Sequence, residues 1–229
     1  MPAASDPPVR DAATVVLVRR DAGSPRVLMG QRGAAAVFMP DKFVFPGGAV
    51  DREDADAWGA VALDPDTARR LAVDGRPELV SALPVAAIRE LWEETGLRLA
   101  RPGEAPAPGG GWPGGWPGGW PGFGLRPHTG ALRLVFRAIT PPGRPRRFDA
   151  RFFLADAADL ADPADDFSAA SGELRHLQWI GLDAARQLPL PFVTGVVLSE
   201  ITARLADPDP DRPVPFFEHT AEGSRFRML

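Results

Sequence analysis

The stretch of sequence that decides the fold spans residues 89–97 and reads Arg-Glu-Leu-Trp-Glu-Glu-Thr-Gly-Leu. Its glutamates, Glu90, Glu93 and Glu94, have the i, i+3, i+4 spacing that places side chains on one face of a helix. The residues on the opposite, mostly apolar stripe are Ile88, Leu91, Trp92 and Thr95. The stretch therefore predicts a helix that buries one side, carries negative charge on the other and ends near Gly96.

The three glutamates have two interpretations. Carboxylates this close repel one another, so the arrangement is costly unless a cation neutralises it. Hard oxygen ligands of this kind suit magnesium, manganese or calcium. The alternative is an acidic helix face in contact with solvent, because glutamate-rich helix surfaces are common.

A glycine-rich segment upstream favours the metal-binding interpretation. Residues 43–48 read Phe-Val-Phe-Pro-Gly-Gly, and the acidic residues Asp51 and Asp54 follow closely. An apolar strand that ends in Pro-Gly-Gly lets backbone carbonyls and amides approach a ligand.

Together the two segments resemble the Nudix box. In that family a glycine, five residues, an acid and seven residues precede Arg-Glu-U-x-Glu-Glu-x-Gly-U, where U is aliphatic. Gly48 to Asp54 fits the first half, with Asp in place of the usual Glu, and residues 89–97 fit the second half at every fixed position. In this chain 34 residues, 55–88, separate the halves. A long insertion at this place resembles the subgroup that contains the peroxisomal coenzyme A diphosphatase, and the stretches 38–48 and 145–153 strengthen that similarity.

The resemblance implies an α+β fold, an α/β/α sandwich with a mixed sheet. We expect a single domain over 1–229, with the box halves at 47–54 and 84–97 and an insertion at 55–83. The sequence pattern predicts strands at 13–19, 26–31, 131–140, 151–154 and 177–180, and helices at 66–73 and 192–205. Pro84 is expected near the start of the acidic helix, where proline is tolerated.

Residues 102–124 contain the repeat Gly-Trp-Pro-Gly three times in succession, at 111–122. Such repeats cannot form a helix or a central strand, so they predict a flexible loop. One interpretation is an aromatic flap that stacks on an adenine ring. The other, which the permissiveness of surface loops favours, is repeat expansion without a function.

Composition narrows the class of protein. The 229 residues carry a formal net charge of −4, which argues against nucleic-acid binding. Cysteine is absent, which removes disulfides, thiolate zinc sites and cysteine nucleophiles. No apolar run is long enough to cross a bilayer, so no membrane partner is expected. Residues 1–10 do not match a signal peptide, and residues 227–229 do not match the peroxisomal address. We therefore expect a cytoplasmic protein. A homodimer is a further expectation from the resemblance.

The resemblance also implies an activity, the hydrolysis of a nucleoside diphosphate linked to another group, with Mg²⁺ or Mn²⁺ as cofactor. Glu90 and Glu94 would be direct metal ligands, with Glu93 nearby and the backbone carbonyl of Gly47 as a further ligand. Arg89 would hold box carboxylates in place through Asp54.

The general base has two origins in the family, a box glutamate or a carboxylate from a distant loop. In the acidic loop 162–173, Glu173 is the preferred candidate, and its alternative role is that of an ordinary surface acid. The catalytic residues expected are thus Glu90, Arg89, Glu93 and Glu173.

An arginine cluster is the candidate for substrate binding. Its members are Arg144, Arg146, Arg147 and Arg151. Arginine suits bidentate contacts with phosphate, and coenzyme A carries a 3′-phosphate besides its diphosphate. We expect Arg146 and Arg147, with Gly48, to bind substrate; alternatively the arginines pair with acids such as Asp149.

Three functions follow from the resemblance. The leading hypothesis is a diphosphatase that converts coenzyme A or acyl-coenzyme A into 3′,5′-ADP and a phosphopantetheine derivative, with a small nucleotide as its partner molecule. The second is cleavage of ADP-ribose or a nucleotide sugar. The third is a catalytically silent domain that binds a nucleotide; three mutually repelling acids argue against it, since a pure binder does not need them.

Overall fold

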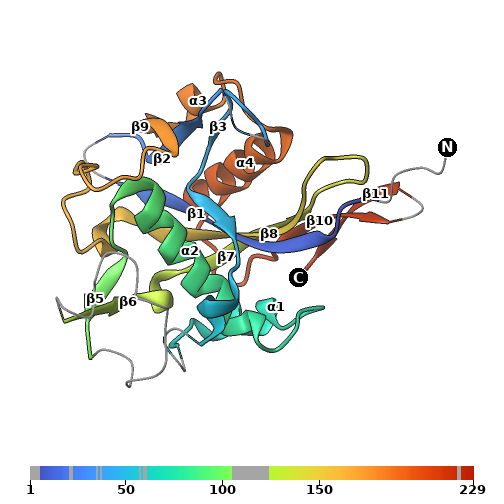
Figure 1. Ribbon diagram of the computed structural model, residues 1–229, viewed down its shortest axis with the longest axis horizontal. Helices are drawn as coiled ribbons and strands as arrows, with labels where there is room; N and C mark the ends of the chain where they lie inside the picture. The colour runs from blue at the N-terminus through green and yellow to red at the C-terminus, as the bar shows by residue number, and fades with distance from the viewer. Residues whose placement is uncertain are drawn as a thin grey trace.

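A mixed β-sheet with helices on both faces forms the centre of the molecule (Figure 1). The computed structural model describes residues 6–20, 23–34, 36, 38–56, 58, 61–104, 124–220 and 223–229. Within these residues nine strands form the sheet, in the order β11-β10-β7-β8-β1-β2-β3, with β4 paired to β1 and β9 paired to β2. The expected α/β/α sandwich is confirmed.

The strands of this sheet are β1 (Val9–Arg19), β2 (Arg26–Arg32), β3 (Phe43–Val44), β4 (Gly47–Ala49), β7 (Arg133–Ile139), β8 (Arg147–Asp156), β9 (Leu174–Gly181), β10 (Pro215–Thr220) and β11 (Gly223–Met228). A separate two-stranded sheet consists of β5 (Ala100–Pro102) and β6 (Leu125–Pro127). The α-helices are α1 (Pro65–Leu71), α2 (Leu79–Thr95), α3 (Leu182–Ala185) and α4 (Phe192–Ala206). Short 3-10 helices cover η1 (Arg52–Ala55), η3 (Thr129–Ala131) and η4 (Ala157–Asp159).

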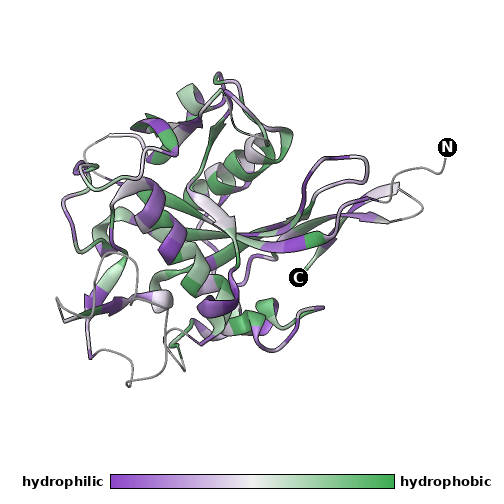
Figure 2. Ribbon diagram, in the orientation of Figure 1, coloured by the Kyte–Doolittle hydropathy of each residue, from purple (hydrophilic) through white to green (hydrophobic). Residues whose placement is uncertain are grey.

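The central strand β1 supplies both hydrophobic cores by alternation. Val15 and Leu17 point to the core shared with α2, whereas Val16 and Val18 point to the core shared with α4. Successive residues of a strand face opposite sides, so a β-branched run buried on both faces forms the middle of the sandwich. In Figure 2, helix α2, which packs on one face of this sheet, carries purple on one side.

The insertion packs into the same core as the acidic helix. Trp58, Leu71 and Leu79 join the cluster of buried side chains formed by α2 and one face of the sheet. Helix α1 begins at Pro65 behind the N-cap Asp64, whose carboxylate accepts a hydrogen bond from the Thr67 N–H. The expected helix in the insertion is therefore present, one residue earlier than predicted at its start.

The acidic helix is longer than expected. It begins at Leu79, so Pro84 lies inside the helix rather than near its start. Proline there withholds the N–H that would bond to the carbonyl of Val80, one turn earlier. Burial of most of α2, including Pro84 itself, supplies the packing that local sequence rules cannot anticipate.

Strand limits and the C-terminal region also differ from expectation. Strands β1, β8 and β9 each begin at least three residues before the predicted starts, because they pair with neighbours over polar segments that lack an apolar pattern. Strands β10 and β11, at 215–220 and 223–228 where no strand is predicted, pair with each other in antiparallel register. The Gly-Trp-Pro-Gly repeats lie outside the described residues. In the part of the chain that is described, no helix has the length and hydropathy to cross a bilayer.

Candidate active site

Glu94 is the most buried of the three glutamates on α2. Glu94 is 2% exposed, and its Oε2 accepts a hydrogen bond from the Gly47 N–H at 2.7 Å. An acidic face in contact with solvent is therefore excluded for this position. Burial raises the pKa of Glu94 well above its usual value, and the charge of Glu90 raises it further.

The glycine corner lies directly against the acidic helix. Strand β4 pairs with β1 through Ala13–Gly48 and Thr14–Gly47, and the Val15 N–H donates to the carbonyl of Pro46 at 2.9 Å. A Cβ atom at Gly48 would lie 2.4 Å from the carboxyl carbon of Glu90. Only glycine leaves room for this carboxylate, so the corner and the helix form one site.

Glu90 is a partly buried carboxylate whose charged form is destabilised. Burial is the main cause that raises the pKa of Glu90 to about 7, and the charges of Glu93 and Glu173 add to it. Arg89 opposes the shift without cancelling it. The partly buried Glu90 and the buried Glu94 thus face the glycine corner at a free-energy cost that a bound cation would relieve.

Arg89 ties the two halves of the split motif together. Its Nε and one terminal nitrogen each donate to an oxygen of Asp54, both at 3.0 Å, and that nitrogen also donates to the carbonyl of Ala49. The other terminal nitrogen donates to Glu90 at 2.8 Å and to Glu93 at 2.9 Å. The expected contact between Arg89 and Asp54 is present, and the shorter side chain of Asp still reaches the guanidinium.

The charge of Arg89 is secured by these acids. Burial on its own lowers the pKa of Arg89, but the hydrogen bond with Asp54 and the charges of Glu90, Asp54 and Glu93 raise it overall. Asp54 is held in turn by the N–H of Asp51 at 2.8 Å. The guanidinium remains protonated and orients Glu90 and Glu93 from behind the site.

The distant acid Glu173 comes close to this cluster in space. It lies just before β9, and its charge raises the pKa of both Glu90 and Glu94, although burial is the larger cause for each. Its Oε1 accepts a hydrogen bond from Arg32 at 3.2 Å, and its side chain is 57% exposed. Arg32 is not among the site residues predicted from the sequence. Its position at the end of the strand before the Phe-Pro-Gly-Gly segment was the available signal.

The carboxylates have the chemistry that a divalent cation requires, but they do not form a complete coordination sphere. Among the described residues, no group of three or more His, Asp or Glu side chains converges closely enough to hold a metal ion. Glu90 and Glu93 each accept a hydrogen bond from Arg89, and the Gly47 N–H donates to Glu94. The hard-oxygen donors and the raised pKa of Glu90 and Glu94 match what Mg²⁺ or Mn²⁺ requires.

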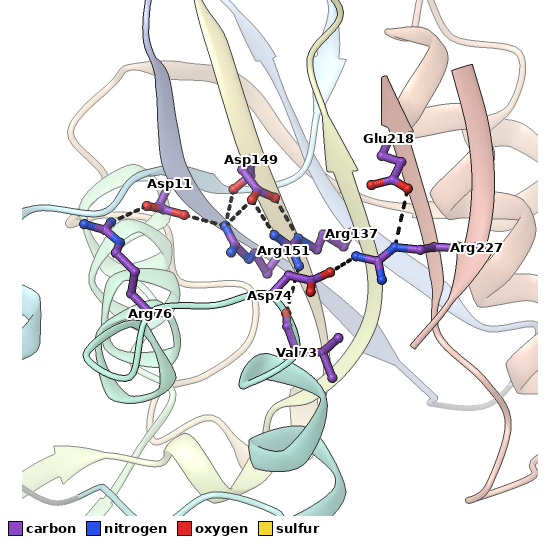
Figure 3. A network of polar contacts seen from close by, with 9 residues as sticks. All are labelled: Asp11, Val73, Asp74, Arg76, Arg137, Asp149, Arg151, Glu218 and Arg227. Carbon is purple, nitrogen blue, oxygen red and sulfur yellow. Dashed lines mark hydrogen bonds and ion pairs between the residues drawn. The ribbon is translucent and has the colours of Figure 1, made fainter. Parts of the chain in front are cut away.

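The arginine cluster divides into two parts. Arg151 is buried and binds Asp11 and Asp149, so it is not available to a phosphate (Figure 3). Arg146 and Arg147, together with Arg10 and three prolines, line an open cavity of about 240 Å³. The interpretation as pairs with acids is correct for Arg151. Arg147 donates to the carbonyl of Thr140 at 3.1 Å and lies 3.8 Å from Asp6, while the phosphate interpretation stays open for Arg146 and Arg147.

Comparison with known proteins gives partial matches in sequence and a near-complete match in structure. No family model matches the chain. The Caenorhabditis elegans protein "Putative nudix hydrolase 7" is 36% identical over 88 residues, which cover 38% of this chain and 22% of that protein. The Gallus gallus protein "Acyl-coenzyme A diphosphatase NUDT19" is 36% identical over an alignment of 134 residues that covers 44% of this chain and 35% of that protein.

Both curated relatives are thus much longer than the segments they share with this chain. The crystal structure of a NUDIX hydrolase from Alicyclobacillus acidocaldarius matches with a TM-score of 0.61 and 29% identity. That match covers 86% of this chain and 92% of the other. The similarity in structure therefore extends over nearly the whole fold.

Proposed function

Because this chain belongs to the Nudix hydrolase family, we propose that it is a metal-dependent diphosphatase acting on a nucleoside diphosphate derivative. The observation that carries the proposal is a pair of carboxylates, the buried Glu94 and the partly buried Glu90, packed against Gly47 and Gly48. A stable fold gains nothing from withdrawing two adjacent acids from solvent. A site that binds a cation does.

The cofactor is Mg²⁺ or Mn²⁺, held by Glu90 and Glu94, with Glu93 nearby and the Gly47 carbonyl as a further ligand. When bound, such an ion neutralises the phosphate oxygens and lowers the pKa of the attacking water. Arg89 fixes the orientation of Glu90 and Glu93 through the contacts described above. Gly48 leaves room for the Glu90 carboxylate, and in this proposal its backbone lies beside the bound diphosphate.

Glu173 is the general base in this proposal. It takes the proton from the water that attacks the diphosphate linkage, a role for which its partly exposed carboxylate is accessible. Glu93 is the alternative within the box. Its carboxylate accepts a hydrogen bond from Arg89 at 2.9 Å and is less exposed than that of Glu173, which favours Glu173 as the accessible base.

Coenzyme A or acyl-coenzyme A is the preferred substrate. The similarity to a protein named acyl-coenzyme A diphosphatase supports this choice. The cavity beside Arg146 and Arg147 supports it too, because coenzyme A carries a 3′-phosphate in addition to its diphosphate. In the sheet, Arg147 pairs with Val9 and Gly48 pairs with Ala13. These two positions of β1 are four residues apart, or ~13 Å along the strand, a span that an extended substrate can cover.

The insertion shares its hydrophobic core with α2, which supports a single domain over the whole chain.

Assays with purified protein test the proposal. With Mg²⁺, we expect the wild type to convert coenzyme A into 3′,5′-ADP and phosphopantetheine faster than it cleaves ADP-ribose, a nucleotide sugar or 3′-dephospho-coenzyme A. Comparable rates on coenzyme A and its dephospho form would remove the phosphate-binding role of Arg146 and Arg147. Faster cleavage of ADP-ribose would favour the second hypothesis. A folded protein inactive on the whole panel would favour a silent binding domain.

Glu94→Gln is the decisive variant for the metal site. We expect at least about a 100-fold loss of metal-dependent turnover, because the amide cannot act as an anionic ligand. The fold should survive, since an amide oxygen still accepts the hydrogen bond from Gly47. Glu78→Gln, the same exchange at the exposed N-cap of α2, is the matched control and should keep wild-type rates. Retained turnover in Glu94→Gln would refute its assignment as a metal ligand.

A further inference from the structure

The pairing of β2 with β9 contains an irregularity beside the candidate active site. From Arg26–Gly181 to Met29–Gln178 the two strands pair in one continuous antiparallel register. The register then shifts, and the remaining pairs are Gln31–Arg175 and Arg32–Leu174. One residue of β2, Gly30, therefore faces two residues of β9, which is the arrangement of a β-bulge.

The bulge residue His176 has an unusual backbone conformation. Its φ of 52° lies in the left-handed region, which non-glycine residues adopt rarely, although histidine does so more often than most. Bulges are frequent beside active sites, where they change the direction of a side chain. This conformation is retained in a strand whose other residues pair regularly.

The bulge decides which residue of β9 lies next to Arg32. If the first register continued without a shift, Arg32 would lie opposite Arg175, and two positive charges would face each other. The shift places Leu174 opposite Arg32 instead, and Glu173 follows directly. Like charges in opposite positions destabilise a strand pair, whereas the observed register gives Arg32 an acidic neighbour.

Arg32 binds that acid and faces the site. Its NH2 group donates to Glu173 at 3.2 Å, and its side chain is 22% exposed. Burial dominates the raised pKa of Glu94, but Arg32 is close enough for its charge to oppose that shift. Arg32 is thus a cation within reach of both Glu173 and a carboxylate of the acidic helix.

We propose that Arg32, set in register by the bulge at His176, is a positioning residue that holds Glu173 at the carboxylate site. This proposal rests on the proposed function in one respect, the role of Glu173 as general base. The ion pair restricts a half-exposed carboxylate at the end of a long loop, which otherwise has many rotamers available. The bulge sets the register that brings Glu173 next to Arg32, and the guanidinium of Arg32 orients the Glu173 carboxylate.

A double-mutant cycle tests the positioning role. We expect Arg32→Met and Glu173→Ala each to lower kcat by about 100-fold, the usual contribution of a general base, with KM changed less than about twofold. The double variant should be no slower than Glu173→Ala alone, because both changes remove the same contribution. Arg32→Lys should recover part of kcat, since an ammonium can still pair with Glu173. Arg175→Met, an arginine exchange one register position away, is the control and should behave like the wild type.

Crystal structures of the wild type and of Arg32→Met provide a readout that does not depend on turnover. The Glu173 carboxylate should lie beside Glu94 in the first and move away in the second. An unchanged position of Glu173, additive losses of kcat, or a rise in KM alone would overturn the proposal; the last would make Arg32 a substrate-binding residue. A wild type that hydrolyses no substrate of the panel refutes the proposed function. In that case the crystal structures alone test whether Arg32 positions Glu173.

Discussion

At the scale of single residues, the site depends on the absence of one side chain. Gly48 lies so close to Glu90 that an added methyl group would overlap the carboxylate. The atoms it would meet are the far end of a flexible side chain, which can move at little cost to the fold. The glycine therefore protects the position of a functional group more than it protects stability.

Gly48→Ala separates these two effects. We expect metal-dependent turnover to fall by at least about tenfold, because displacing a reacting group by about 1 Å can cost as much as 100-fold. The unfolding midpoint should change little. Gly181→Ala is the control, since a Cβ at Gly181 meets no atom within 4 Å and should alter neither quantity. Full activity in Gly48→Ala would show that Glu90 does not need its observed position.

At the scale of elements, the end of α2 connects the acidic helix with the acidic loop. Gly96 caps the helix with φ of 77°, and its N–H donates to the carbonyl of Trp92 at 2.7 Å. A Cβ there would come within 3.0 Å of the Ala169 and Ala170 backbone. One turn earlier, the carbonyl of Glu93 accepts a hydrogen bond from the Ser171 N–H. The helix end thus places the loop that leads to Glu173.

Gly96→Ala should therefore destabilise the protein by about 1–2 kcal/mol, the cost of a left-handed conformation in a residue with a Cβ. Crowding against the loop should also lower kcat. Chemical unfolding measures the first effect and steady-state kinetics the second. Gly195→Ala in α4 is the control, because open space surrounds that position and alanine is the better helix former by about 1 kcal/mol. Equal stabilities of the two variants would contradict this account of the helix end.

Local sequence patterns are sufficient to predict the elements that carry the chemistry. The acidic helix, β2 and α4 follow from apolar periodicity and glycine signals, and the contact of Arg89 with Asp54 follows from the family resemblance. The role of Arg32 does not, because it depends on a bulge in β9 that arises only when two distant strands pair. The burial of Glu94 is equally non-local, since it requires the Gly47 amide from another part of the chain.

At the scale of the whole molecule, a polar network joins the sheet, the insertion and the C-terminal strands β10 and β11 (Figure 3). Asp149 at its centre binds Arg137 at 2.6 and 2.9 Å and Arg151 at 3.2 Å, and both arginines are buried. Arg137 also donates to the carbonyl of Val73 in the insertion. Within the insertion, Asp74 pairs with Arg227 of β11. Asp149 thus pairs with both buried cations, and Asp11 pairs with Arg151 as well, where three parts of the chain meet.

Asp149→Ala should destabilise the protein by about 3–5 kcal/mol, the usual cost of leaving a buried charge without its partner. Urea unfolding measures the loss. Arg76→Ala removes an arginine that is 65% exposed at the edge of the same network, and it should cost less than about 1 kcal/mol. We expect the free energies of unfolding of the two variants to differ by several kcal/mol. If both variants lose the same stability, Asp149 contributes no more to stability than the edge of the network.

The two-stranded sheet β5–β6 has a consequence for how this protein can change over evolutionary time. Pro102 pairs with Leu125, so this pairing closes a segment of 22 residues, 103–124. The entropy of closing a segment grows only with the logarithm of its length. Changes in the number of residues between the two paired positions therefore add little to the closure cost, which lets the length of this segment differ between relatives.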